Sequence, residues 1–418
     1  MNLLFLVHRI PYPPNKGDKI RSYHELRYLA ARHRVHVGCL VDQPEDLAHV
    51  ATLRQIAASV EAVPLDPRRA RLRSLTALAS GEPLSVRYFA SGALRRWVHE
   101  TVERERIDAV LLFSSPMFEY VRDLPVPVVM DFCDVDSDKW RQYVAHAPLV
   151  MRPVYALEAR RLRAYEEKVL RACRSAVLVA ERERRMWSSM PDGLLEKVRV
   201  IPNGVDLEFF APHAGPPAAR EPRAIVFTGA MDYYANIDGV TFFADEVLPR
   251  IRAAEPDAHF YIVGSRPAPE VVALGKRAGI TVTGFVDDVR AYYARAAVCV
   301  VPLRIARGIQ NKLLEALAMG RPVVATRAAA EGLEPGAADA LRTAGDAAAL
   351  AAECVALLQA PDTAEALGQA GRRYVERAYL WDRALAGLEA LLQEAAGSSG
   401  ATPETVPAAA PQRVPNPV

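Results

Sequence analysis

The sequence predicts an α/β protein made of two doubly wound domains in tandem, and three observations support this fold class. The chain has 418 residues, which is more than one hydrophobic core usually organises. Short apolar runs alternate with helical patterns along most of its length, as in parallel strands joined by right-handed βαβ crossovers. A proline-rich stretch, HAGPPAAREPR, interrupts this alternation near the middle of the chain.

The first domain is predicted to span residues 1–205, with a linker at 206–222. Its expected strands are NLLFLV, RVHVGCLV, VEAVPL, DAVLLF, PVVMDF and SAVLVA, with helical segments between them. The opening apolar run is short and has neither a basic region before it nor a small-residue cleavage site. It therefore indicates a first strand rather than a signal peptide. A Pro-Asn-Gly turn in VRVIPNGVDLEFFAP ends the series.

The second domain is predicted to span residues 223–380. Its expected strands are AIVFTG, HFYIVG, ITVTGF, VCVVPL and RPVVAT, again separated by helices, and only helices follow residue 346 or so. A C-terminal helix is expected at 381–395, and its return to the first domain is one option. The last stretch, 396–418, is rich in Gly, Ser, Pro and Ala, so we expect a disordered tail.

Composition narrows the class of function. Hydrophobic residues make up 51% of the chain and charged residues 24%, as in globular proteins. Because 52 basic residues balance 50 acidic ones, no overall field favours nucleic acid. The five cysteines stand singly, without metal-site spacing, which indicates free thiols in a reducing cytoplasm. No stretch approaches the roughly 20 apolar residues of a membrane span, so any membrane contact is expected to be peripheral.

The stretch RGIQNKLLEALAMGRPVVAT carries the strongest functional signal. It follows the strand that ends at Leu303, and it brings Arg304, Arg307 and Lys312 to the start of a helix expected to open near Gly308–Gln310. Cations at a positive helix end favour a bound anion such as a diphosphate. One turn further on, Glu315 could accept two hydrogen bonds from a ribose diol. The alternative is an ordinary surface ion pair between Glu315 and Lys312.

Four segments place this stretch in a wider context. They are VIPNGVDLEFFAP, IVFTGAMDY, GFVDDVRAYYARAAVCVVPLR and NKLLEALAMGRPVVAT. Together they resemble the motifs of GT-B glycosyltransferases, in particular the retaining family-four group, over about residues 1 to 395. Within that group, HRIPYPPNKGDKIRSY, DFCDVDSDKW and GIQNKLLEALAMGRPVV are most similar to sugar transferases associated with PEP-CTERM/exosortase exopolysaccharide clusters.

The resemblance implies a GT-B fold with two tandem Rossmann-like domains and a nucleotide diphosphate sugar as donor. The acceptor would be a glycan or a lipid-linked hydroxyl, and no cofactor or metal would be obligatory. The expected location is the cytoplasm, with peripheral contact on the inner face of the membrane as an option. The residues it assigns to donor binding are Gly17, Gly229, Gly308, Ile309, Gln310, Asn311 and Glu315.

The sequence departs from the family in two places. The family's Glu-x7-Glu motif maps its second Glu onto Glu315 but its first onto Arg307. The loop GAMDYYANIDG also lacks the Arg and Lys that the family often places there. We therefore expect Arg304, Arg307 and Lys312 to supply the positive charge that stabilises the leaving diphosphate.

The first domain offers further candidates. MDFCDVDSDKW crowds four aspartates behind a strand, of which Asp134 and Asp136 are predicted to contact the acceptor. An Asp-x-Asp metal site is the less favoured interpretation. His8 could line a cleft or simply end its strand. The arginine- and leucine-rich DPRRARLRSL could attract anionic lipid or form a solvated face.

Two rival functions remain at this stage. A nucleotide-sugar 2-epimerase shares the fold, and Arg307 in place of a Glu keeps it open. A non-catalytic sugar-nucleotide-binding subunit of a polysaccharide assembly complex is the other. The chain lacks dinucleotide-binding, P-loop, zinc-protease and nucleophile-elbow motifs, so dehydrogenases, NTPases and hydrolases are disfavoured.

Overall fold

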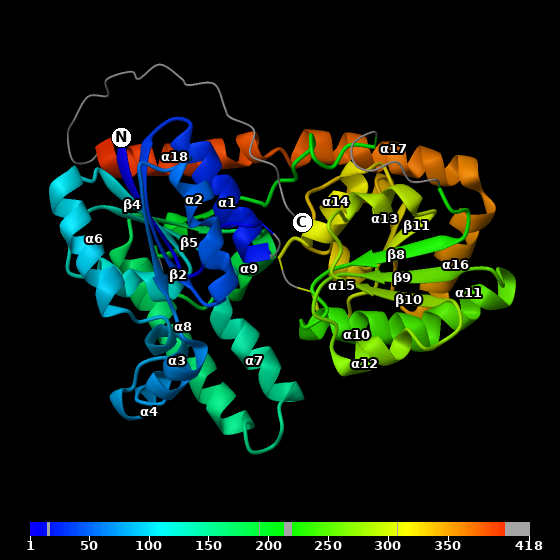
Figure 1. The fold of residues 1–418 in the computed structure, drawn as a ribbon, viewed down its shortest axis with the longest axis horizontal. Helices are drawn as coiled ribbons and strands as arrows, with labels where there is room; N and C mark the ends of the chain where they lie inside the picture. Colours follow the sequence, from blue (N-terminus) through cyan, green and yellow to red (C-terminus); the bar gives the residue numbers. More distant parts are fainter. Residues whose placement is uncertain (15–16, 192, 213–219, 307, 398–418) are drawn as a thin grey trace. The chain divides into compact units, whose positions relative to one another are not determined.

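The computed structural model describes residues 1–14, 17–191, 193–212, 220–306 and 308–397, which form two compact units (Figure 1). The first unit contains Met1–Ile201 and residues 385–397, and the second contains Pro202–Ala384. The division between Ile201 and Pro202 lies slightly before the predicted boundary. Residues 206–212 of the predicted linker pack within the second unit, where Arg372 donates to the carbonyl oxygens of Leu207 and Phe210.

The described residues of the first unit contain a seven-stranded sheet in the order β3-β2-β1-β4-β5-β6-β7. Its strands are β1 (Asn2–Val7), β2 (Arg34–Val41), β3 (Ser59–Pro64), β4 (Ala109–Phe113), β5 (Val128–Cys133), β6 (Ser175–Leu178) and β7 (Val198–Val200). Each neighbouring pair is parallel. The central strands are almost entirely buried, as expected for a parallel sheet covered on both faces.

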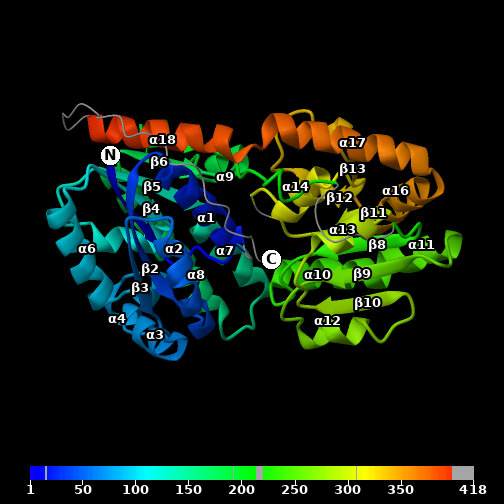
Figure 2. The same cartoon turned by 45° about the horizontal axis from the view of Figure 1, so that its top comes forward.

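Helices cover both faces of this sheet (Figures 1 and 2). The helices of this unit are α1 (Gly17–Ala30), α2 (Val50–Arg54), α3 (Pro67–Ser74), α4 (Ala77–Ser80), α5 (Leu84–Tyr88), α6 (Gly92–Glu105), α7 (Asp136–His146), α8 (Arg152–Ala172), α9 (Glu181–Met186) and the larger part of α18 (Trp381–Gly397). Glu389 of α18 accepts a hydrogen bond from Tyr28 at 2.9 Å and lies 2.9 Å from His33 Nε2. These contacts attach α18 to the first unit.

The second unit is also a doubly wound sheet, with six strands among its described residues in the order β10-β9-β8-β11-β12-β13. The strands are β8 (Ala224–Thr228), β9 (His259–Val263), β10 (Ile280–Gly284), β11 (Val298–Val301), β12 (Val323–Thr326) and β13 (Arg342–Ala344). All of the pairings are parallel. Two parallel, doubly wound units confirm the fold class that the sequence predicts.

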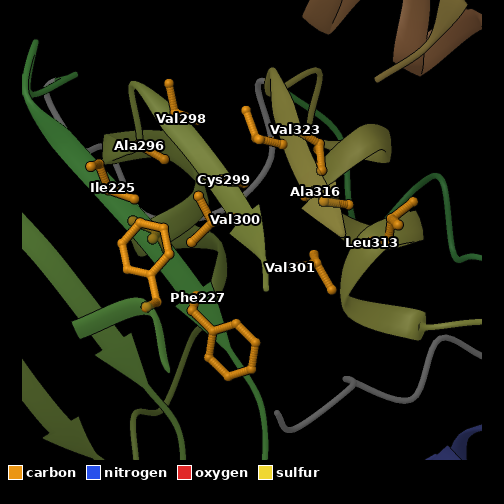
Figure 3. Close-up of a cluster of buried hydrophobic side chains, with 14 of the residues drawn as sticks. Ile225, Phe227, Ala296, Val298, Cys299, Val300, Val301, Leu313, Ala316 and Val323 are labelled. Atoms are coloured by element: carbon orange, nitrogen blue, oxygen red, sulfur yellow. The ribbon is translucent and has the colours of Figure 1, made fainter. Parts of the chain in front are cut away.

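The helices of the second unit are α10 (Tyr234–Phe242), α11 (Leu248–Ala254), α12 (Pro269–Leu274), α13 (Arg290–Arg295), α14 (Asn311–Ala318), α15 (Arg327–Ala330), α16 (Ala347–Gln359) and α17 (Pro361–Ala378). Figure 3 shows Leu313 and Ala316 of α14 in a buried cluster with side chains of β11 and β12. Leu313, Leu314 and Leu317 are fully buried there. This packing fixes α14 against the sheet and sets the direction in which its polar face points.

Glycines end three neighbouring strands at the carboxyl edge of this sheet, namely Gly229 after β8, Gly264 after β9 and Gly284 at the end of β10. A Cβ atom on Gly264 would lie 1.7 Å from the carbonyl oxygen of Gly229. The two strand ends therefore approach more closely than any other residue type allows.

Replacing Gly264 with alanine is expected to lower stability by roughly 3 kcal/mol, because the new methyl group must displace backbone and the residue has a φ of +150°. Gly81 is a suitable control, because it has a φ of +77° but a Cβ atom there would meet none of the described residues within 4 Å. Urea unfolding of both variants tests this. If Gly264→Ala and Gly81→Ala lose the same free energy of unfolding, the close approach of the two strand ends does not contribute to stability.

Candidate functional site

The loop between β11 and α14 brings the main-chain groups of the candidate site to the carboxyl edge of the second sheet. Gly308 has a φ of +52°, which a right-handed helix does not accommodate, and Gln310 is extended. The helix therefore begins at Asn311, slightly later than the sequence predicts. Gln310 makes no side-chain cap hydrogen bond, and the side chain of Ile309 packs into the core. Residues 308–310 lead into the N-terminal end of α14, where the first backbone N–H groups of a helix have no partner within it.

Glu315 lies on the polar face of α14 and is half-buried. Its Oε2 accepts a hydrogen bond of 2.9 Å from the hydroxyl of Tyr293, which also bonds Thr228 at 2.7 Å. Burial raises the pKa of Glu315, although the Tyr293 bond and the charge of Lys312 act in the opposite direction. Tyr293 orients this carboxylate, which still has lone pairs for further donors.

Lys312 lies one turn before Glu315 on the same helix. Its Nζ donates to Asn236 Oδ1 at 2.9 Å and lies 5.1 Å from the ring centre of Phe227. Desolvation of the ammonium lowers its pKa to about 8. Lys312 and Glu315 thus each bond a neutral partner, in contrast to the surface ion pair considered as an alternative. A poorly solvated cation of this kind is stabilised when an anion binds beside it.

Gly229 and Asn311 line the same region. A Cβ atom on Gly229 would lie 2.8 Å from the Asn236 amide nitrogen and 3.2 Å from Lys312 Cε, so the glycine leaves space for both side chains. Asn311 Oδ1 accepts from Asn203 Nδ2 at 3.1 Å. The structure therefore places Gly229 beside Lys312, whereas Asn311, the first residue of α14, bonds Asn203 instead.

Arg304 has a different environment from Lys312. Its guanidinium makes a two-pronged ion pair with Asp238, one contact being 3.0 Å, and packs over the ring of Phe242. About half of the side chain is exposed. A ligand must therefore compete with Asp238 for this cation. Arg307, which the sequence also assigns to this site, lies outside the described residues.

The first unit holds the candidates at the edge of the other sheet. Gly17 is exposed at the start of α1, directly before Asp18. His8 Nε2 lies 3.5 Å from Asp18, and its ring is stacked against Phe113. Burial opposes ionisation of Asp18, yet hydrogen bonding to His8 and the charge of Arg9 hold its pKa well below the ordinary value. His8 thus belongs to a polar cluster at the end of β1.

The four aspartates of DFCDVDSDKW have separate surroundings. Asp131 is fully buried and pairs with Arg21 at 2.7 Å. Asp138 is buried and binds Arg141. Asp136 begins α7 and lies 3.9 Å from Lys139, whereas Asp134 is half-buried. Asp134 and Asp136 are therefore the more accessible members. Over the described part of the chain, no group of three or more His, Cys, Asp or Glu residues could hold a metal ion.

Two residues that contact Lys312 and Glu315, namely Asn236 and Tyr293, are not predicted from the sequence. Asn236 and Tyr293 come from α10 and α13, far from α14 in sequence. Tyr293 stands in the segment GFVDDVRAYYARAAVCVVPLR, but nothing in that segment says which of its two adjacent tyrosines points inward. Asn236 lies in the loop-and-helix segment noted for lacking cations. Its amide oxygen accepts the hydrogen bond from Lys312, so a neutral side chain lies where the family often places a cation.

The arrangement of two parallel, doubly wound units is shared with solved GT-B glycosyltransferases. Sucrose-phosphate synthase from Thermosynechococcus elongatus is similar, with 16% sequence identity, a TM-score of 0.68, and coverage of 95% of this chain and 100% of that one. HepE from Anabaena, solved in complex with UDP-glucose, has 16% identity, a TM-score of 0.64, and coverage of 96% and 99%. WaaG, a glycosyltransferase involved in lipopolysaccharide biosynthesis, has 16% sequence identity and a TM-score of 0.62, with coverage of 95% of this chain and 99% of that one. The fold is GT-B.

The second unit carries a more specific similarity. Residues 222–360 match the family model described as "Glycosyl transferases group 1". This interval includes Asn236, Tyr293, Lys312 and Glu315. No curated protein matches the sequence significantly. The family match and the GT-B fold together support a glycosyltransferase.

The lowered pKa of Lys312 predicts a pH-dependent affinity for nucleoside diphosphate. Because the free protein loses this proton near pH 8, the dissociation constant for UDP should rise as the pH increases above 8, by up to about tenfold per pH unit. Isothermal titration calorimetry at several pH values above 7 would measure this. Below pH 8, where Lys312 is charged, the affinity should be nearly constant.

Lys312→Arg is the matched control for this titration, because arginine stays charged throughout the range. Its affinity should change little between pH 7 and about 9.5, even if it is weaker at every pH. If the dissociation constant of Lys312→Gln for UDP rises above pH 8 as steeply as that of the native protein, another group causes the pH dependence.

Proposed function

We propose that this protein is a retaining glycosyltransferase that moves a sugar from a nucleotide diphosphate sugar to a hydroxyl acceptor. One observation carries the proposal. The half-buried Glu315 carboxylate and the desolvated Lys312 ammonium lie one turn apart on α14, at the carboxyl edge of a parallel sheet, within the interval that matches the group 1 glycosyltransferases. Ligands of open α/β sheets bind at this edge.

In the proposed complex, Glu315 accepts hydrogen bonds from the two ribose hydroxyl groups. Tyr293 holds the carboxylate in place, which leaves the second oxygen for the ligand. Lys312 and the backbone N–H groups of residues 308–311 bind the diphosphate. Arg304 and Arg307 are proposed to add positive charge, Arg304 after exchange of its Asp238 partner. The binding of HepE to UDP-glucose supports a donor of this chemical class.

The reaction requires stabilisation of negative charge on the leaving diphosphate. The bond from the anomeric carbon to the phosphate oxygen breaks, and the acceptor oxygen forms its bond on the same face of the sugar, so the configuration is retained. The acceptor hydroxyl gives its proton to the departing phosphate. Lys312 and the helix end would stabilise the charge that develops, and they act strongly because the site is poorly solvated.

The acceptor is proposed to contact the first unit, where Asp134 follows β5 and Asp136 begins α7. Carboxylates suit an acceptor rich in hydroxyl groups, so a glycan or lipid-linked sugar fits this chemistry. We assign the protein to exopolysaccharide or other surface glycan synthesis on the sequence resemblance given above. The proposed location is the cytoplasm, in keeping with five free cysteines.

A ligand-stabilisation experiment tests donor binding. We expect one of UDP, GDP, ADP and dTDP to raise the unfolding temperature selectively, since a ligand at a hundred times its dissociation constant adds about 2.7 kcal/mol of stability. Glu315→Ala and the milder Glu315→Gln should abolish most of this shift. Glu270→Ala, at an exposed glutamate of the same unit, is the control and should respond as the native protein does.

The outcome separates the candidate functions. If no nucleotide stabilises the native protein, donor binding at Glu315 is wrong. If a nucleotide binds but its sugar conjugate is never turned over in the presence of glycan acceptors, a non-catalytic binding subunit is favoured. Conversion of a nucleotide sugar to its C2 epimer without acceptor, followed by proton NMR, would instead indicate an epimerase.

The stereochemical prediction is separate. With an α-linked donor, proton NMR of the first product should show an α linkage, and Lys312→Ala should lower kcat by at least about a hundredfold, because it removes charge stabilisation at the leaving group. Formation of the β product would overturn the retaining mechanism while leaving the transferase activity in place.

A further inference from the structure

A pocket of about 340 Å³ lies in the second unit, between the turn that follows α14 and one face of α17. Helix α17 lies beside α14 in both views (Figures 1 and 2). Met319–Arg321 and Pro212 form one wall, and the other wall consists of Glu365, Gln369, Arg372 and Arg373. The spacing of the α17 residues places them on one face of the helix. The volume is in the range of pockets that hold small molecules.

The pocket is separate from the site around Glu315. Arg321 lies just before β12, at the amino edge of the second sheet, whereas Lys312 and Glu315 follow β11 at the carboxyl edge. In a parallel sheet all of the carboxyl ends lie along one edge and all of the amino ends along the other. An inference drawn from this pocket therefore does not rest on the proposed function.

The end of α14 fixes the position of Arg321. Gly320 has a φ of +64°, and its N–H donates to the carbonyl oxygen of Leu317 at 2.9 Å. The N–H of Arg321 donates to the carbonyl oxygen of Ala316 at 3.0 Å. These two bonds and the positive φ form a Schellman motif, which ends a helix at a defined residue. The side chain of Arg321 therefore leaves the main chain at a fixed point beside the pocket.

The guanidinium group of Arg321 is partly buried without being paired. Its Nε is buried and has no hydrogen-bond partner among the described residues. Desolvation lowers the pKa of Arg321 below its ordinary value. The carboxylate that lines the same pocket, Glu365, is instead paired with Arg220 at 2.9 Å. A desolvated cation without a partner is unfavourable, and a bound anion would offset this cost.

The charges around the pocket have an excess of positive sign. Arg372 donates to two main-chain carbonyl oxygens and pairs with Glu376. Arg373 is exposed on the same helix. Two positive charges remain unmatched when the basic groups are set against the acidic ones, namely Arg220, Arg321, Arg372 and Arg373 against Glu365 and Glu376. A phosphate monoester carries about two negative charges at pH 7.

We propose that this pocket binds a phosphorylated small molecule of the sugar phosphate class. The phosphate contacts the guanidinium groups of Arg321 and Arg373, because the N–H groups of arginine match the oxygens of a phosphate in pairs. Gln369 and Glu365 lie on the same wall, and amide and carboxylate groups form hydrogen bonds with hydroxyl groups such as those of a sugar. The pocket also has room for a molecule larger than the phosphate ion itself.

Isothermal titration calorimetry of the full-length protein with glucose 6-phosphate, inorganic phosphate and glucose tests this proposal. Glucose 6-phosphate should bind at millimolar concentrations or below, inorganic phosphate more weakly, and glucose not at all. Arg321→Gln should weaken the binding of glucose 6-phosphate about tenfold or more, and Arg373→Gln about threefold because Arg373 is exposed. Arg321→Lys should restore only part of the affinity, since lysine lacks the planar fork of N–H groups.

Arg377→Gln is the matched control, because Arg377 is an exposed arginine of the same helix that does not line the pocket. It should bind glucose 6-phosphate as the native protein does, and so should Lys312→Ala. Loss of this binding in Lys312→Ala but not in Arg321→Gln would assign the phosphate to the site beside Glu315 and overturn the proposal. Equal affinities for glucose 6-phosphate and inorganic phosphate would overturn the assignment to a sugar phosphate.

Thermal unfolding without ligand separates a binding role of Arg321 from a structural one. Arg321→Gln should unfold at the same temperature as the native protein or slightly higher, because it removes an unpaired, desolvated charge. No binding of either phosphate to the native protein, or equal binding by the native protein and Arg321→Gln, would overturn the proposal. Arg373→Gln changes an exposed side chain, so its affinity tests the pocket even if Arg321→Gln does not fold.

Discussion

The parallel pairing of the strands in both sheets is the constraint on which the candidate site depends. When neighbouring strands run in the same direction, their carboxyl ends lie along one edge, and each connection must return across a face of the sheet. Residues far apart in sequence then meet at that edge. In the second unit this brings Asn236 after β8, Tyr293 from the helix before β11, and Lys312 with Glu315 after β11 into one hydrogen-bonded cluster.

Two cations, Arg21 and Lys312, show how differently the molecule uses charge. In the first unit, Arg21 is fully buried and is matched by Asp131, Glu25 and the carbonyl oxygen of Ile201. Burial and the nearby Asp131 raise the pKa of Glu25 well above its ordinary value. The charge of Arg21 is thus compensated within the unit. Lys312 instead donates to a neutral amide oxygen and has a lowered pKa, so an incoming anion would improve its environment.

Much of this architecture can be predicted from the sequence, and the exceptions have physical reasons. Strand cores such as Asn2–Val7 follow from uninterrupted apolar runs, and Glu315 is conspicuous as a carboxylate among leucines and alanines. The start of α14 is predicted too early because the backbone angle φ of Gly308, which is positive, cannot be read from the residue type alone. The aspartates near Asp131 cannot be separated by sequence, because burial and ion pairs depend on partners such as Arg21, over a hundred residues away. Tyr293 and Asn236 escape prediction for the same reason.

The segments through which the chain enters and leaves the second unit contact each other. Val205 N–H donates to the Tyr379 carbonyl oxygen at 2.8 Å, Val205 and Leu380 form a parallel bridge, and Gly204 leaves no room for a Cβ atom against the Trp381 backbone. The second unit therefore begins and ends at adjacent positions, like a domain inserted into a host chain. A segment with paired ends of this kind can be exchanged as a cassette, so that recombination could replace the second unit while the first unit stays intact.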